Sequence, residues 1–270
     1  GGLASPAMPV PEPPTSDASL LGALTTPDRS LLGALTSPDV GARARAGAIL
    51  AVPLGSTEQH GPHLPLATDT DVAVALCGGL ARRRGDVLVA PPLPYGSSGE
   101  HAGFPGTVSI GAAVLEQVVV ELVRSATLTV TRVLIVSTHG GNHDPLTRAV
   151  ATLRAESRDV LAFSPRWPAS AISAGDAHAG AVETALQLAL APDRVRLADA
   201  VAGPRVPVGQ LMPRLRAEGV AGVSPSGVLG DPTGATAAQG QTLLAEFAAQ
   251  LAAAVDEWAG PVAPEAEAGR

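Results

Sequence analysis

The feature that most constrains the fold is an alternation of short apolar segments with longer amphipathic ones. The apolar segments predict buried strands at residues 46–55, 86–93, 132–138 and 159–165. Helices are predicted from about Thr68 or Thr70, where polar caps precede an apolar stretch, and over 112–126, 144–157, 179–190 and 234–259. Apolar strands separated by helices form mostly parallel sheets covered on both faces. We therefore expect an α/β three-layer sandwich with a mostly parallel central sheet flanked by helices.

The chain is expected to have one domain with two extensions. Residues 1–45 are predicted to form a flexible N-terminal arm, residues 46–258 the domain, and residues 259–270 a C-terminal tail. The arm carries an 11-residue tandem repeat, SLLGALTTPDR at 19–29 and SLLGALTSPDV at 30–40. Two copies are too few for a solenoid. The preferred interpretation is that their leucines pack against the main body or a neighbouring subunit.

Charge and composition exclude several classes of partner. The net charge is −7, and a footprint for nucleic acid or anionic lipid requires clustered cations. The single cysteine, Cys77, cannot form an internal disulfide. No apolar run approaches the roughly 20 residues of a membrane helix, and the N-terminal residues lack the pattern of a signal peptide. We expect a cytoplasmic protein with no nucleic-acid or membrane partner.

The segment GSTEQHGPHLPLATD, residues 55–69, has the residue types of a metal site. Glu58 and His60 are two positions apart and point the same way in an extended segment. The glycine and prolines that follow force an irregular path that can bring Asp69 back toward them. Two carboxylates and an imidazole suit zinc, iron(II) or manganese. The alternative, a capped loop with surface acids, does not explain why the pair directly follows a buried strand.

A second polar segment, VSTHGGNHD, follows the clearest predicted strand. His139 ends that strand, and Gly140 and Gly141 let the backbone pass close to whatever His139 binds. Asn142 is expected to cap the next helix. The alternative interpretation is a tight turn with a solvent-exposed histidine.

A third segment, GDAHAGAVET, places His178 just before a predicted helix and Glu183 about one turn into it. The small residues around His178 would keep this helix end open to a substrate. Alternatively, Glu183 only stabilises the positive end of the helix.

Together these segments resemble a known family. The series STEQHGPHLPL–TD, YG–SGEH–FPGT, HGGN and HAG–ET covers most of residues 46–192 and is similar to the motif series of the creatininase family of metal-dependent amidohydrolases. The resemblance implies a homo-oligomer, hexamer-like or larger. The stretch at 219–240 further resembles the branch of that family that serves mycofactocin biosynthesis. It implies as substrate a modified precursor peptide, from which a C-terminal Val-Tyr dipeptide is released.

The resemblance also implies the roles of the site residues. Two divalent metal ions are expected, Zn²⁺ and/or Fe²⁺, with Mn²⁺ as a further candidate. One ion would be held by Glu58, Asp69 and His139, and the other by His60, Asp69 and Glu183. His178 would protonate the departing amine, and whether Glu183 is a ligand or a general base stays open. The residues expected to orient ligands or bind substrate are His63, Glu100, His101 and Asn142.

One departure from the family pattern bears on the substrate. Creatininase proper has Tyr-Glu where this chain has Gly140 and Gly141, and that glutamate binds the second metal. Glu183 is the candidate replacement, and creatinine is disfavoured as substrate. Two alternatives stay open, namely a hydrolase acting on another small cyclic amide or formamide, and a catalytically silent metal-binding homologue.

Overall fold

A parallel four-stranded sheet forms the centre of the molecule. The computed structural model describes residues 30–261, and its strands are β1 (Ile49–Leu54), β2 (Val87–Val89), β3 (Arg132–Ser137) and β4 (Asp159–Phe163). Their order is β2-β1-β3-β4, and every neighbouring pair is parallel. The predicted parallel α/β sheet is confirmed.

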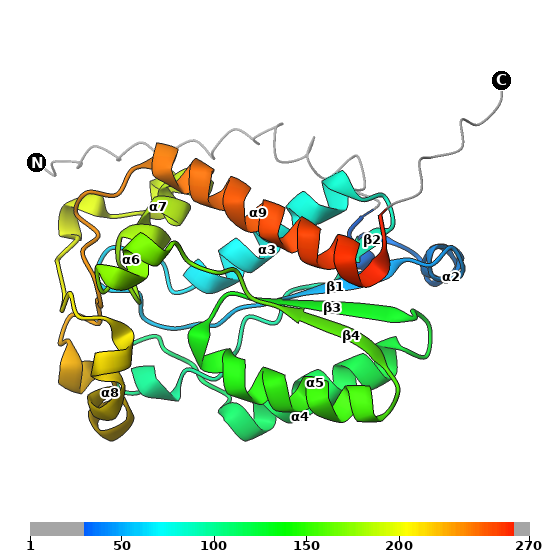
Figure 1. The fold of residues 1–270 in the computed structure, drawn as a ribbon, viewed down its shortest axis with the longest axis horizontal. Coiled ribbons are helices and arrows are strands. Elements are labelled where there is room, and N and C mark those ends of the chain that lie inside the picture. Colours follow the sequence, from blue (N-terminus) through cyan, green and yellow to red (C-terminus); the bar gives the residue numbers. More distant parts are fainter. Residues whose placement is uncertain (1–29, 262–270) are drawn as a thin grey trace, which may run out of the picture.

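Helices cover both faces of this sheet. The principal ones are α3 (Thr68–Arg83), α4 (Ala112–Ala126), α5 (His143–Ala155), α7 (Ala181–Leu190) and α9 (Ala237–Ala259). Helices α3, α7 and α9 lie over one face, and α4 and α5 lie over the other (Figure 1). The other helical elements are η1 (Leu32–Ala34), α2 (Ser37–Arg45), η2 (Gly99–His101), η3 (Gly140–Asn142), α6 (Ala169–Ser173), η4 (Pro192–Arg194), η5 (Leu197–Asp199) and α8 (Val208–Val223). The arrangement is the predicted three-layer sandwich.

The central strand β1 shows why the sheet needs both helical layers. Successive side chains of a strand point to opposite faces. Ile49 and Ala51 accordingly pack in the core beneath α3, α7 and α9, whereas Leu50 and Val52 pack in the core against α4 and α5. All six residues of β1 are buried, so β1 is apolar throughout rather than alternating.

Strand β2 is shorter than predicted. The apolar run at 86–93 was expected to be a strand throughout, but the strand ends at Val89. Pro91 and Pro92 follow, and proline has no N–H to donate to a neighbouring strand. After these prolines the chain pairs with the end of β1 again at Leu93, whose amide donates to the carbonyl oxygen of Pro53 at 2.8 Å and whose carbonyl oxygen accepts from the amide of Gly55 at 3.0 Å.

Residues 30–45 were predicted to belong to a flexible arm, and this part of the prediction is wrong. The amide of Val89 donates to the carbonyl oxygen of Ser30, and helix α2 follows with a capping box formed by Thr36 and Asp39. Leu32 and Leu35 pack against the core. The second repeat copy therefore packs against the main body. The first copy and residues 1–18 lie outside the described residues.

Helices α6 and α8 were not predicted. Helix α8 contains Pro213 and bends at Gly219, whose φ of 67° is outside the helical range. These residues interrupt its apolar period, which explains why the sequence pattern did not reveal it. In the described part of the chain, no helix is long and apolar enough to cross a membrane.

Candidate metal centre

The predicted metal-site residues converge where the parallel strands end. Glu58 and His60 follow β1, His139 follows β3, and Glu183 lies in the first turn of α7. Asp69 lies in the first turn of α3, whose N-cap is Ala67. Its Oδ2 accepts a hydrogen bond from Ser56 Oγ at 2.5 Å. The carboxyl edge of the sheet is where ligands bind in open α/β folds.

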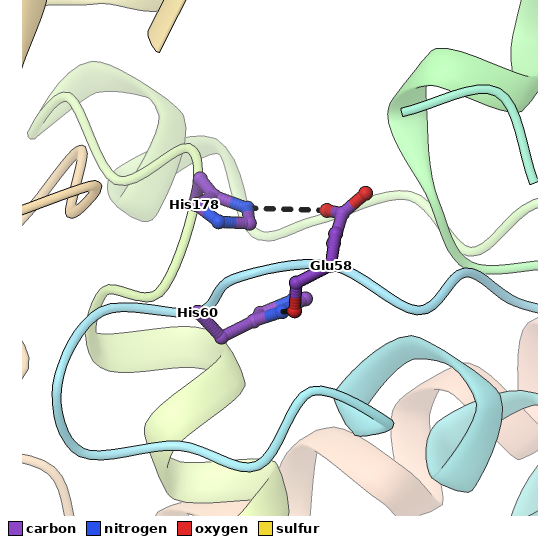
Figure 2. Close-up of side chains that lie close together, drawn as sticks. All are labelled: Glu58, His60 and His178. Carbon is purple, nitrogen blue, oxygen red and sulfur yellow. Dashed lines mark hydrogen bonds and ion pairs between the residues drawn. The ribbon is translucent and has the colours of Figure 1, made fainter. Parts of the chain in front are cut away.

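Among residues 30–261, three groups of side chains are close enough to share a cation. Glu58, Asp69 and His139 form one group, and His60, Asp69 and Glu183 form another, with the potential ligand atoms of each group within 4.8 Å of one another. These are the two predicted sets, and Asp69 belongs to both. The third group combines Glu58 and His60 with His178, whose imidazole faces the Glu58 carboxylate (Figure 2).

Unpartnered buried atoms show that this cluster fits a cation. Both carboxylate oxygens of Glu58 and the Nε2 atom of His60 are buried without a hydrogen-bond partner. Both side chains have no solvent exposure. A buried carboxylate that accepts no hydrogen bond has lost its hydration at a cost in free energy, which nearby imidazoles offset in the absence of a cation; the nearest is His139, with Nδ1 3.2 Å from Glu58 Oε1. Divalent cations bound between these oxygen and nitrogen atoms would remove that cost.

Backbone carbonyl groups set the orientation of the imidazoles. His60 Nδ1 donates to the carbonyl oxygen of Glu58 at 3.1 Å, and His139 Nε2 donates to that of Ser97 at 3.0 Å. A carbonyl can only accept, so each of these ring nitrogens carries a proton. The other nitrogen of each ring faces the cluster, with His60 Nε2 at 3.6 Å from Asp69 Oδ1 and His139 Nδ1 at 3.2 Å from Glu58 Oε1. Metal-binding histidines are held in this way.

A backbone carbonyl group also orients His178. Its Nε2 donates to the carbonyl oxygen of Gln59 at 2.8 Å. Its Nδ1 lies 3.7 Å from Glu58 Oε1 and 4.0 Å from Glu183 Oε2. Burial, together with the nearby positive charges of His60 and His101, holds the pKa of His178 well below its usual range. A neutral imidazole therefore presents a proton-accepting nitrogen to the cluster.

In the absence of metal, the pKa values of three proposed ligands are raised, so these ligands bind protons more tightly than usual. Burial lowers the pKa of His60 and of His139, but the surrounding carboxylates outweigh it and raise both values to about 10. Burial and the negative charge of Asp69 raise the pKa of Glu183 to about 8. Without metal, the cluster thus holds protons at atoms that a divalent cation would contact.

A cavity of about 920 Å³ opens over the cluster. The predicted site residues that line it are Asp69, Glu100, His101, His139, His178 and Glu183. Glu100 Oε1 lies 3.5 Å from His139 Nε2. The volume is near the upper end of the range of roughly 300–1,000 Å³ for ligand sites. It admits a molecule larger than a single small ring.

His63 and Asn142 are not among the lining residues. His63 is buried with its Nε2 at 2.9 Å from Thr184 Oγ1, so it supports the residue next to Glu183. Asn142 was expected to cap α5, but its side chain makes no capping hydrogen bond. Its amide group instead accepts from the amide of Ser97 at 2.9 Å and donates to the carbonyl oxygen of Gly55 at 3.0 Å. Asn142 thereby ties together the loops that follow two strands.

Gln59, which was not predicted as a site residue, orients His101. The backbone amide of Gly61 donates to Gln59 Oε1 at 2.9 Å, which fixes the orientation of the side-chain amide. Gln59 Nε2 then donates to His101 Nδ1 at 2.8 Å and to the carbonyl oxygen of Gly227 at 3.2 Å. His101 therefore carries its proton on Nε2, at 3.5 Å from Glu58 Oε1. The only sequence feature that pointed to Gln59 was its position between Glu58 and His60.

The family model described as creatinine amidohydrolase matches residues 33–255. The chain belongs to the creatininase family. It is 48% identical over 215 residues to the mycofactocin precursor peptide peptidase of Mycolicibacterium smegmatis, covering 78% of this chain and 85% of the relative. It is 30% identical over 182 residues to the creatinine amidohydrolase of Pseudomonas putida, covering 58% of this chain and 70% of the relative.

Solved creatininases share the fold and include metal-bound forms. A structure titled creatininase Mn has a TM-score of 0.70 and 27% identity, and a variant described as Zn-Zn type has a TM-score of 0.68 and 26% identity. Both matches cover 86% of this chain and 99% of the other. With the buried ligand cluster, family membership makes this protein a metal-dependent hydrolase of amide bonds.

Proposed function

We propose that this protein is a peptidase that removes the C-terminal Val-Tyr dipeptide from the modified mycofactocin precursor peptide. The observation that carries this proposal is the pair of ligand sets that share Asp69 beneath a cavity of about 920 Å³. The identity of 48% with a mycofactocin precursor peptide peptidase supports the substrate.

The metal-binding part of the proposal assigns each ligand to an ion. Glu58, Asp69 and His139 would hold one divalent ion, and His60, Asp69 and Glu183 the other. Two such ions lower the pKa of a bound water and polarise the scissile carbonyl. Zinc, iron(II) and manganese all suit mixed oxygen and nitrogen ligands. The zinc and manganese forms of solved creatininases support zinc and manganese as candidates.

Residues of the chain would move the protons of the reaction. His178 Nδ1 faces Glu58 and Glu183 from the cavity wall and is held by the Gln59 carbonyl. From this position it accepts a proton from the attacking water and donates it to the departing amine. Glu183 Oε2 accepts a hydrogen bond from the amide of Ala179 at 2.6 Å. This bond keeps its carboxylate directed toward His60.

Hydrolysis of a small cyclic amide is the competing function, because of the identity with creatinine amidohydrolase. Gly141 counts against it. This residue stands where the creatininase resemblance places a metal-binding glutamate. A Cβ at Gly141 would clash with Ser97 O, with Glu100 Oε1, and at 2.5 Å with His139 Nε2. The side chain of Glu100 therefore fills the space that a residue at 141 would need.

The deciding experiment uses the metal-loaded protein and the modified precursor peptide. Mass spectrometry should detect the Val-Tyr dipeptide and the shortened peptide, and creatinine offered in parallel should remain unchanged. The Glu58→Ala variant should bind less metal and lose the activity. Peptide left intact by protein loaded with both metals would overturn the proposed substrate. Full activity of Glu58→Ala would instead overturn the metal-site assignment.

We further propose a homo-oligomer, hexamer-like or larger, as the family resemblance implies. Since residues 30–40 pack on the sheet, the first repeat copy at 19–29 is the candidate for contact with another subunit. Light scattering of a variant lacking residues 1–29 tests this. A smaller assembly supports the role of the repeat, and an unchanged mass counts against it.

A further inference from the structure

The turn between His178 and helix α7 has an unfavourable backbone conformation. Ala179 in this turn has a φ of 51° and no solvent exposure. A residue with a Cβ adopts this left-handed conformation only where its surroundings impose it, and such residues cluster at functional sites. His178 directly precedes Ala179, and Glu183 lies in the first turn of α7. The conformation of the turn therefore decides how His178 and Glu183 face each other.

The first half of the turn is fixed by pairing with Leu229. The amides of Ala177 and His178 donate to the carbonyl oxygen of Leu229 at 2.8 and 3.1 Å. The amide of Leu229 donates in return to the carbonyl oxygen of His178 at 2.8 Å. This pairing ends at His178, so other contacts must place the start of α7.

Asp176 provides such a contact through its carboxylate. Its Oδ2 accepts a hydrogen bond from the amide of Val182 at 2.8 Å. The first amides of a helix have no partner within the helix, and the N-cap residue of α7, Gly180, has no side chain to accept from them. Glu183 makes the reciprocal bond, because its Oε2 accepts from the amide of Ala179 at 2.6 Å. The carboxylates of Asp176 and Glu183 thus hold the turn from its two ends.

The backbone around Asp176 fits closely around its carboxylate. The residue is 7% exposed, and its Oδ1 is buried without a hydrogen-bond partner. A Cβ at Gly180 would clash with this oxygen, and one at Gly230 would lie 2.7 Å from it. Burying a carboxylate oxygen without a partner opposes folding, so a role in the site explains this residue better than a role in stability.

Asp176 itself does not reach the substrate cavity. The cavity is lined by Ala177, His178 and Glu183 but not by Asp176. Glu183 Oε2 lies 4.0 Å from His178 Nδ1 and 3.7 Å from His60 Nε2. A shift at the start of α7 would change both distances. Asp176 therefore acts on the reaction through the residues that it places.

We propose that Asp176 is a positioning residue that keeps the side chains of His178 and Glu183 directed at the metal centre. This inference rests on the proposed function, in which Glu183 binds one ion and His178 transfers protons. Without the Asp176 carboxylate, the turn relaxes and the start of α7 moves. The ion held by His60, Asp69 and Glu183 is then bound more weakly, whereas binding of the peptide changes little.

The Asp176→Ala variant tests this role by zinc affinity and by kinetics. Zinc is titrated into metal-free protein against a chromophoric chelator, and one of the two sites should bind about 10- to 100-fold more weakly than in the wild type. With both sites loaded, kcat for the modified precursor peptide should fall by a similar factor, whereas KM should change little. Asp176→Asn retains an acceptor for the Val182 amide and should recover most of both losses.

Two further variants separate this role from simple helix capping. Asp39→Ala is the matched control, because the Asp39 carboxylate also accepts a backbone amide at a helix start, that of Thr36 before α2. It should lower the thermal stability but leave zinc affinity and kcat unchanged. Gly180→Ala should reproduce the weaker zinc site, since the added Cβ displaces the Asp176 carboxylate. Circular dichroism checks that each variant is folded.

Wild-type zinc affinity and kcat in folded Asp176→Ala would overturn the proposal. If that variant does not fold, the same result in Gly180→Ala overturns it. Equal losses in Asp176→Asn and Asp176→Ala would overturn the role of the hydrogen bond to Val182. The zinc titration needs no substrate, so it also separates this inference from the proposed function. If the wild type leaves the precursor intact but Asp176→Ala still weakens one zinc site, the proposed function fails and the positioning role stands.

Discussion

The Nε2 atom of His178 lies 2.8 Å from the backbone carbonyl oxygen of Gln59. The side chain of the same glutamine donates to His101 at 2.8 Å. One residue, placed between two proposed metal ligands, thereby fixes the protonated nitrogen of two further imidazoles. Both rings direct their other nitrogen toward Glu58.

Replacing Gln59 with leucine should impair catalysis without emptying the metal centre. The variant keeps the backbone carbonyl that holds His178 but loses the donor to His101. We expect kcat to fall by about 10- to 100-fold, the usual effect of removing a group that orients site residues. Metal content should remain at the wild-type level. Gln250→Leu, which removes an amide bonded only to the backbone of Arg166, is the matched control and should be fully active. Wild-type kinetics of Gln59→Leu would contradict this role.

Asp69→Asn and Glu183→Gln should differ in metal content. Asp69 belongs to both ligand sets, whereas Glu183 belongs to one. Elemental analysis should find less than one ion per chain in Asp69→Asn and about one in Glu183→Gln. Because hydrolysis requires both ions in the proposed mechanism, each variant should lose at least about a hundredfold in kcat/KM. Equal metal content in the two variants would show that Asp69 is not shared.

Metal binding to the metal-free protein should release protons. The pKa values of His60 and His139 are raised to about 10 in the absence of metal, so both imidazoles are protonated at pH 7. A cation requires the neutral ring. Its affinity should therefore rise with pH from about 7 to about 10 and fall as the pH is lowered. Calorimetric titration with zinc in buffers of different ionisation enthalpy should show more than one proton released per chain. A heat that does not depend on the buffer would contradict these protonation states.

The sequence predicted the parts of the fold and site that follow from local pattern. Four apolar runs marked the strands, and the polar segments after two of them contain Glu58 and His139, which the creatininase resemblance assigned to one ion. The sequence could not predict features that depend on tertiary packing. The side chain of Asn142 bonds to Ser97 and Gly55 rather than capping α5 because the loops after β1 and β2 lie beside it. Helix α8 was not predicted because its proline and glycines interrupt the helical pattern, although several of its residues line the cavity.

Gly141→Ala and Gly140→Ala form a matched pair that tests how tightly the site is packed. A Cβ at Gly140 would meet no atom within 4 Å, whereas one at Gly141 would clash with Ser97, Glu100 and His139. The backbone carbonyl of Ser97 cannot move far without its neighbours, because the amide of the same residue is bonded to Asn142. His139 and Glu100 must therefore shift. We expect Gly140→Ala to be fully active and Gly141→Ala to lose on the order of a hundredfold in kcat, since a displacement of about 1 Å has this effect in active sites. Steady-state kinetics and metal content of both variants check the prediction. Equal activity of the pair would show that the loop yields easily and that His139 is not held in place by it.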